Sequence, residues 1–297
     1  MESGIDLLAT ILPDRPRISV IITNIEASTN FFVVSFPFVL SYILKKSKFS
    51  ERRIETFFLI YLIIGLLITM SRSALLAIIL SSAIIFYLVR RRRFYQLIFA
   101  VTFVVLIFWL YEPLNNLLSS FLRIESGFSA RDYLWEMSMD MIKDNAVFGL
   151  GPGVYKHEML NYFPYMLDDW WGRFIIYLRE VTGGDNLSHN FYLTLFTEMG
   201  VLGFLTALFL PFVFLRIGIK TLIKFRGADK NSYYLVIALF AAGSSIIFRN
   251  FFNGIGLIYV GGIQTDLPFW LIFGSLVYFY KLPKPKALTS EILSNDS

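Results

Sequence analysis

Residues 56–89 decide the fold, and they read TFFLIYLIIGLLITM, then SRS, then ALLAIILSSAIIFYLV. About 20 apolar residues in a helix cross the hydrocarbon core of a bilayer. Each of these two apolar runs is slightly shorter than that, so we expect flanking residues to complete it. Only three residues, with Arg72 in the middle, separate the runs. The stretch therefore predicts two antiparallel membrane helices joined by a tight turn.

The rest of the chain follows the same pattern. Of the 297 residues, 56% are hydrophobic and 16% are charged, whereas roughly a quarter of the residues in a soluble domain are charged. This balance excludes a soluble globular domain and a disordered chain. Five further apolar runs lie at residues 27–44, 94–111, 191–215, 233–248 and 267–280. We therefore expect an all-α integral membrane protein with about seven transmembrane helices.

Basic residues orient these predicted spans. Clusters of Lys and Arg follow the first, third, fifth and seventh spans, at residues 45–53, 90–93, 216–230 and 281–286. Cytoplasmic loops are enriched in such residues, so all four clusters and the carboxyl terminus are predicted to be cytoplasmic. The inner face then carries 17 basic and 5 acidic residues, and the outer face 10 basic and 17 acidic. The net charge of +5 reflects this asymmetry and does not indicate a surface for nucleic acid.

The predicted organisation has five parts. They are an outer N-terminal segment (1–26), four transmembrane helices (27–111), a large extracytoplasmic loop (112–190), three transmembrane helices (191–280) and a cytoplasmic tail (281–297). A weaker glycine-rich stretch, residues 251–263, is either a re-entrant segment or a loop. The chain begins outside without a signal peptide, so we expect that it lacks earlier spans, or that its first helix is inserted by its flanking charges. The absence of cysteine excludes disulfides, zinc–thiolate sites and a thiol nucleophile.

The loop of residues 112–190 is predicted to carry the function, because long ordered loops usually do. It contains both histidines of the protein, eleven acidic residues and six basic ones. Residues 129–145 predict an amphipathic helix that starts with a capping box and has apolar residues at helical spacing. A surface helix that only rests on the bilayer is the alternative. Glycines at 149–153 predict a tight turn, and His157 is interpreted as a surface histidine.

Polar side chains continue into the helix that follows His189. They form one stripe at helical spacing, made of Asn190, Thr194, Thr197 and Glu198. On a straight helix Glu198 would lie about 13 Å from its start. A carboxylate at that depth is costly, so it marks either a functional site or a tie between helices.

Two arginines are predicted at the outer ends of spans. Arg72 lies in the turn of the hairpin, and Arg249 follows the sixth span. Each side chain could simply extend to the lipid headgroups. The alternative is that each binds phosphate, for which the guanidinium geometry is well suited.

Four short motifs, in this order, resemble those of the O-antigen ligase and O-antigen polymerase family of polytopic glycan transferases. Residues 69–74 resemble its Ser-Arg-Gly-Ala element, with Ser73 in place of Gly. Residues 131–135 resemble its Arg-x-x-x-Trp loop helix, and residues 149–153 its glycine-rich turn. The strongest match is His-Asn followed by Gly-x-x-Gly, at residues 189–203. The resemblance covers roughly residues 15–280, and the family usually has more spans, so the chain looks like its carboxyl-terminal portion.

The resemblance implies glycosyl transfer at the outer face of the cytoplasmic (inner) membrane of a bacterium. The donor would be an O-antigen, capsular or exopolysaccharide glycan linked to undecaprenyl diphosphate. The acceptor would be a sugar hydroxyl, on lipid A core for a ligase or on another lipid-linked repeat for a polymerase. Membrane lipids would surround both. Because arginines would carry the charge of the leaving group, no metal or other cofactor is implied.

The resemblance also assigns the site residues. His189 would be the general base that takes the proton of the acceptor, and Glu198 would orient the helix or the histidine. Arg72 and Arg131 would neutralise the leaving diphosphate. The rest of the implied substrate-binding set is Asn190, Gly151, Gly153 and Arg249.

Three alternatives stay open at this point. A flippase or other transporter of lipid-linked oligosaccharide would also carry membrane arginines, although the sequence shows none of the internal repeats typical of transporters. An inactive, truncated member of the family would keep the same motifs. A seven-helix receptor or light-driven pump fits the count of spans, but the seventh span has no lysine to hold retinal.

Overall fold

The computed structural model describes residues 25–46, 48–69, 71–110, 130–162, 188–254, 256–258 and 263–285. Within these ranges the regular structure is helical and no strand is present. The long helices of the bundle are α2 (Ile25–Lys45), α3 (Arg53–Thr69), α4 (Arg72–Val89), α5 (Arg91–Leu110), α10 (Phe191–Phe225), α11 (Lys230–Arg249) and α12 (Ile263–Lys281). Each corresponds to one of the predicted apolar runs, so the all-helical class is confirmed.

Four stretches of these helices are long and apolar enough to cross a membrane. Among the described residues they are Ser28–Lys45, Arg72–Val89, Phe191–Phe225 and Lys230–Arg249. The other long helices are not in this group. α3, for example, has 17 residues and is about 26 Å long, which falls short of a hydrocarbon core of about 30 Å. A multi-pass membrane protein is supported, whereas the count of seven spans stays a prediction.

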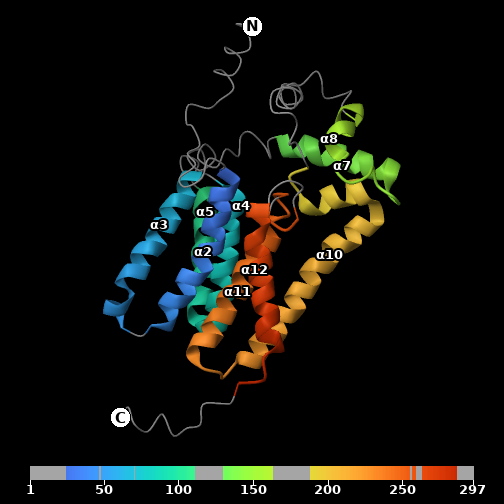
Figure 1. Ribbon diagram of the computed structural model, residues 1–297. Helices are drawn as coiled ribbons and strands as arrows, with labels where there is room; N and C mark the ends of the chain where they lie inside the picture. The colour runs from blue at the N-terminus through green and yellow to red at the C-terminus, as the bar shows by residue number, and fades with distance from the viewer. Residues whose placement is uncertain are drawn as a thin grey trace.

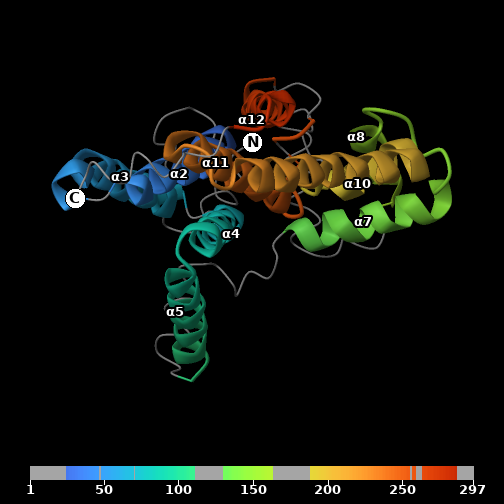
Figure 2. The same ribbon diagram turned by 90° about the horizontal axis from the view of Figure 1, so that it is seen from below.

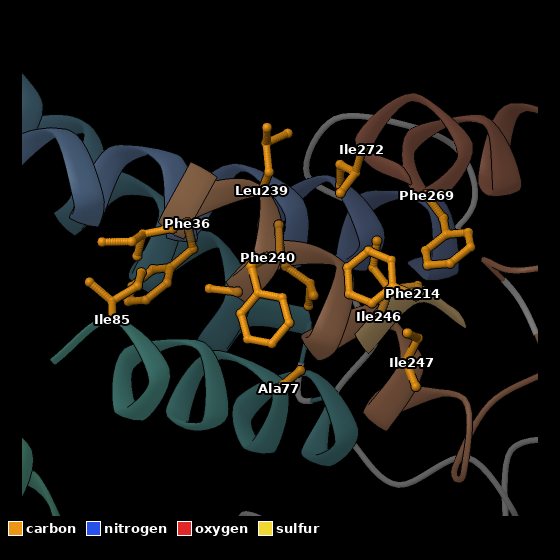
Figure 3. Packing of buried hydrophobic residues seen from close by; sticks show 14 of the residues in the cluster. Phe36, Ala77, Ile85, Phe214, Leu239, Phe240, Ile246, Ile247, Phe269 and Ile272 are labelled. Carbon is orange, nitrogen blue, oxygen red and sulfur yellow. The ribbon is translucent and has the colours of Figure 1, made fainter. Parts of the chain in front are cut away.

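α11 is the central helix of the bundle and packs against α2, α4, α10 and α12. Figure 3 shows Phe240 of α11 in the middle of the buried cluster, with Ala77 of α4 and Phe214 of α10 beside it. Ser245 of α11 also donates a hydrogen bond to the carbonyl of Ala77 at 2.9 Å. The charged residues of α11 lie at its two ends, and its middle part is apolar on every side. A helix that is apolar all round is buried all round.

α3 and α5 lie at the edge of the bundle. α3 packs mainly against α2, and α5 packs against α4. Figure 2 shows α5 leaning away from the other helices. Large apolar side chains of both helices are exposed, for example Phe57 on α3 and Phe99 on α5. Such side chains suit a lipid environment, in which apolar surface needs no burial within the protein.

A smaller helical unit lies at one end of the bundle, beside α10 (Figure 1). It consists of α7 (Ala130–Asn145), α8 (Tyr155–Glu158) and the 3-10 helix η3 (Met159–Tyr162). Its own core is made of Leu134, Met137, Met141, Tyr155 and Met159. The predicted helix at residues 129–145 is confirmed, with its end at Asn145.

Several predictions fall outside the described residues. They concern the segment 1–24, the loop stretches 111–129 and 163–187, and the tail after 285. The predicted capping box also lies outside the described residues, which include neither Ser129 nor the side chain of Asp132. In the stretch 251–263, the described residues 251–254 and 256–258 form turns and bends before α12 begins. These residues therefore belong to a loop.

Candidate active site

His189 lies in a tight turn just before α10. Its φ is +49°, a left-handed conformation that non-glycine residues adopt rarely and that is often found at functional sites. Ser188 and Thr194 share a hydrogen bond between their hydroxyls at 2.7 Å, and the N–H of Asn190 donates to Ser188 Oγ at 3.2 Å. These contacts fix the backbone of the turn on both sides of His189, whose side chain is partly exposed.

Asn190 begins α10 as its N-cap. Its Oδ1 accepts from the backbone N–H groups of Tyr192 at 3.0 Å and Leu193 at 3.2 Å. A side-chain oxygen at this position satisfies donors that have no partner within the helix. Asn190 is also buried. The amide oxygen is thus already used by the backbone, which favours a structural role for Asn190.

The His189 turn is attached to two other elements. On one side, Trp135 of α7 donates its indole Nε1–H to the carbonyl of Ser188 at 2.9 Å. On the other side, the N–H of Phe191 donates to the carbonyl of Asn250, at the end of α11, at 3.1 Å. The turn therefore joins the small helical unit to the membrane bundle.

Tyr192 strengthens the attachment to α11. Its hydroxyl donates to the carbonyl of Ile247 at 3.3 Å, and its ring stacks on Phe251 with centroids 4.3 Å apart. These contacts place the start of α10 against the end of α11. The residues after His189 therefore have little freedom to move relative to the bundle.

α10 is not straight, and here the prediction was wrong. At Gly200 the backbone has φ 60° and ψ −151°, a combination that is essentially limited to glycine. Residues 191–199 form a short arm that lies at an angle to the long part, residues 201–225 (Figure 1). The bend follows Glu198, so Glu198 still lies about 13 Å along the arm from its start, but it does not lie within one straight helix of residues 191–215. It lies at the bend, at the end of the long part that is beside the small helical unit.

The glycine-rich turn packs directly against this bend. Gly149 is so close that a Cβ there would lie 2.5 Å from the backbone of Glu198, and a Cβ on Gly200 would lie 2.3 Å from the carbonyl oxygen of Val147. Backbone hydrogen bonds join the two segments, from Leu150 N to Thr197 O at 2.9 Å, Gly151 N to Glu198 O at 2.8 Å and Val201 N to Ala146 O at 2.9 Å. The turn thus satisfies groups that lose their helical partners at the bend.

The members of the turn differ in what surrounds them. Gly151 has φ +107°, and its N–H is used in the bond to Glu198. Gly153 has φ +76°, and a Cβ there would meet nothing within 4 Å. Gly151 therefore has a clear structural use at the bend, while the space beside Gly153 leaves room for a ligand.

Glu198 is 5% exposed and connects α10 with α8. Its Oε1 accepts from the N–H of Tyr155 at 3.4 Å. The Tyr155 hydroxyl is within hydrogen-bond distance of the Leu134 carbonyl at 3.1 Å and of the Ser138 hydroxyl at 3.0 Å. Burial raises the pKa of Tyr155, so its hydroxyl stays protonated and can donate. This chain of contacts links Glu198 to the core of the small unit.

Arg72 and Arg131 are both partly exposed. Arg72 is the first residue of α4. It lies at the same end of the bundle as Arg249, because the contact between Ser245 and Ala77 aligns α11 with α4. Arg131 lies on α7 one helical turn before Trp135, hence on the same face as the residue that contacts the His189 turn. His157 is exposed, as predicted.

Comparison with known families gives a clear result. The sequence model of the O-antigen ligase family matches residues 57–208, just over half of the chain. The chain belongs to the O-antigen ligase family. No curated protein matches it significantly. Membership supports a glycan-ligating function at a membrane, with lipid-linked glycan as the substrate class.

The matched range includes most of the candidate site of this O-antigen ligase family member. It contains Arg72, Arg131, the glycine-rich turn, His189 and Glu198, and it excludes Arg249. Among the described residues, no three His, Asp or Glu side chains come together in a group that could hold a metal ion.

Arg249 lies in a buried polar cluster that the sequence analysis did not predict. It is 2% exposed, and its Nη1 donates to Asn30 Oδ1 of α2. Asn30 Nδ2 in turn donates to the carbonyl of Thr265 in α12 at 3.2 Å. The Arg249 side chain is therefore directed into the bundle and does not extend to the headgroups. Its burial favours a role in connecting three helices over direct contact with a ligand.

A signal for this cluster was present in the sequence. Ser28, Thr29 and Asn30 interrupt the start of the first apolar run, and Asn250 and Asn253 follow the sixth. All five residues are buried. Polar residues at the ends of apolar runs often mark interior sites, but only the fold shows that these two groups meet.

Proposed function

We propose that this protein transfers a glycan from undecaprenyl diphosphate to a sugar hydroxyl at the outer face of the cytoplasmic membrane. His189 is the general base. The observation that supports this role is the position of His189 on a left-handed turn attached to both α7 and α11. An imidazole held in this way is pre-positioned for proton transfer, which typically accelerates a reaction by about 10²–10⁴-fold.

The reaction is a direct displacement. The acceptor hydroxyl gives its proton to the His189 imidazole, and its oxygen forms a bond to the anomeric carbon of the donor. The bond between that carbon and the diphosphate oxygen breaks, so the diphosphate leaves with the electron pair and the configuration inverts. Arg72 and Arg131 pair with the diphosphate and stabilise the charge that it gains.

The other candidate residues support this arrangement. Glu198 orients the bend of α10 through its contact with the Tyr155 N–H, and Arg249 holds α11 against α2. Asn190 and Gly151 fix the backbone near the histidine, and Gly153 lies where a substrate has room. The acceptor is lipid A core for a ligase or another lipid-linked repeat for a polymerase, and the carboxyl terminus lies in the cytoplasm.

The test uses the purified protein in vesicles, with a lipid-diphosphate-linked glycan and a glycan acceptor supplied on the outer face. His189→Ala should reduce transfer by at least about 10²-fold, whereas His157→Ala, which changes an exposed histidine of the same unit, should leave transfer unchanged. Transfer should also fall on acidification, since a general base must be unprotonated. Full activity of His189→Ala would refute the assignment. A donor that crosses the membrane but stays chemically intact would identify a flippase instead.

A further inference from the structure

Two apolar side chains stand out on the small helical unit. Val147 is 65% exposed and Phe148 is 88% exposed, the highest value among the exposed large hydrophobic residues that the structure describes. They come one residue after the end of α7 and precede Gly149. The same unit buries Leu134, Met137 and other apolar residues in its own core. The small unit can therefore bury apolar side chains, yet it leaves Val147 and Phe148 exposed.

The backbone of the pair is held against the bend of α10. The carbonyl of Ala146 accepts the N–H of Val201, the first residue after the bend, at 2.9 Å. The carbonyl of Val147 lies directly against Gly200. Figure 2 shows α7 and α8 on either side of α10, and the turn that carries the pair passes round the bend between them. Val147 and Phe148 are thus fixed at the point where the long part of α10 begins.

The length of α10 beyond that point matches the thickness of a bilayer core. From Val201 to Lys220, an exposed residue near the other end of α10, a helix rises about 29 Å. The hydrocarbon core of a bilayer is about 30 Å thick. If Lys220 lies at one boundary, where its ammonium reaches the headgroups, Val201 and the neighbouring pair lie at the other boundary.

The backbone of the pair is attached to a stretch of α10 whose apolar side chains are also exposed. Val201, Leu202 and Leu205 are 46%, 69% and 56% exposed, and they belong to a helix that is long and apolar enough to span a membrane. We propose that Val147 and Phe148 insert into the lipid at the membrane surface and anchor the small helical unit there. Burial of apolar side chains between headgroups and acyl chains stabilises such contacts.

This anchor would set the height of the adjoining segments. The glycine-rich turn and Glu198 are bonded to the same bend, so they would be held at headgroup level. The inference rests on exposure and on the geometry of α10, and it is independent of the role of His189.

The experiment exploits the absence of cysteine from the chain. A single cysteine replaces Phe148, carries a nitroxide label, and is studied in vesicles of phosphatidylethanolamine and phosphatidylglycerol. Collision rates with oxygen, which concentrates in lipid, and with a water-soluble nickel chelate report the environment of the label. Leu202→Cys on the spanning helix provides the lipid reference, and His157→Cys on the exposed side of the unit provides the water reference.

We expect the ratio of oxygen to nickel collision rates at position 148 to be close to that at 202 and several-fold higher than that at 157. A ratio at 148 equal to that at 157 would overturn the proposal. A label at 148 that neither reagent reaches would indicate a protein partner and would also overturn it. Val147→Cys repeats the measurement at the neighbouring position. The proposal requires that the labels at both positions be protected from the nickel chelate.

Discussion

At the scale of single residues, Gly200 determines the shape of the site. Its backbone conformation is available to glycine and to hardly any other residue, and the space for a side chain is already occupied by the carbonyl of Val147. The sequence offered Gly200 as part of a Gly-x-x-Gly pattern, which is usually a sign of close helix packing. The apolar pattern also continues on both sides of it. For these reasons the sequence pattern does not indicate the bend, although it contains the glycine that makes the bend possible.

We predict that Gly200→Ala destabilises the protein. The forbidden conformation alone costs about 1–3 kcal/mol, and the contact of 2.3 Å with the Val147 carbonyl oxygen adds to that cost. The measurement is the midpoint of thermal unfolding in detergent. Gly274→Ala is the matched control, because a Cβ there meets nothing within 4 Å and alanine favours a helix by up to about 1 kcal/mol over glycine. Equal midpoints for wild type and Gly200→Ala would contradict the prediction.

At the scale of elements, three helices together position His189. They are α7, the start of α10 and the end of α11. The end of α7 at Asn145 agrees with the prediction, because helix signals are local in the sequence. The contact of Trp135 with Ser188 spans 53 residues, and the polar cluster joins Asn30 to Arg249 across 219. Contacts of this kind depend on tertiary packing, so a single sequence does not reveal them.

The Trp135 hydrogen bond makes a specific prediction about catalysis. Trp135→Phe keeps an aromatic ring but removes the indole N–H that holds the Ser188 carbonyl. A lost hydrogen bond costs about 1 kcal/mol of stability, whereas a displaced catalytic group can lower the rate by up to about 10²-fold. We therefore expect kcat for transfer to fall by at least about tenfold, with little change in KM for the donor.

Trp270→Phe is the matched control for this variant. It removes an equivalent bond, from an indole to the Leu257 carbonyl at 2.9 Å, on a helix that does not carry the histidine turn. Both variants should unfold at similar temperatures, and only Trp135→Phe should lose activity. Equal rates for the two variants would show that Trp135 has a structural role alone.

At the scale of the whole molecule, charge and helix direction describe the same topology. The predicted inner face carries 17 basic and 5 acidic residues, and the four basic clusters lie at or just after the carboxyl-terminal ends of α2, α4, α10 and α12. The runs α2–α3–α4 and α10–α11–α12 alternate in direction (Figure 1). Each basic cluster therefore falls at the same end of the bundle, opposite the small helical unit. The charge pattern is a property of the sequence and the helix directions are a property of the fold, so the two indicate the same topology independently.

The agreement predicts which positions face the outside. Single cysteines are placed at His157 in the small unit, at Lys48 between α2 and α3, and at Asn231 at the start of α11, all of which are exposed. In intact spheroplasts a membrane-impermeant maleimide should label only the cysteine at 157, and those at 48 and 231 should react after permeabilisation.

Labelling at 48 in intact spheroplasts would show that residue 48 faces outward, which would contradict the predicted crossing of α2. Labelling at 231 would contradict the predicted direction of α10. Because all three variants carry the same reagent-reactive group on an exposed residue, differences between them report the face of the membrane and not the chemistry of the site.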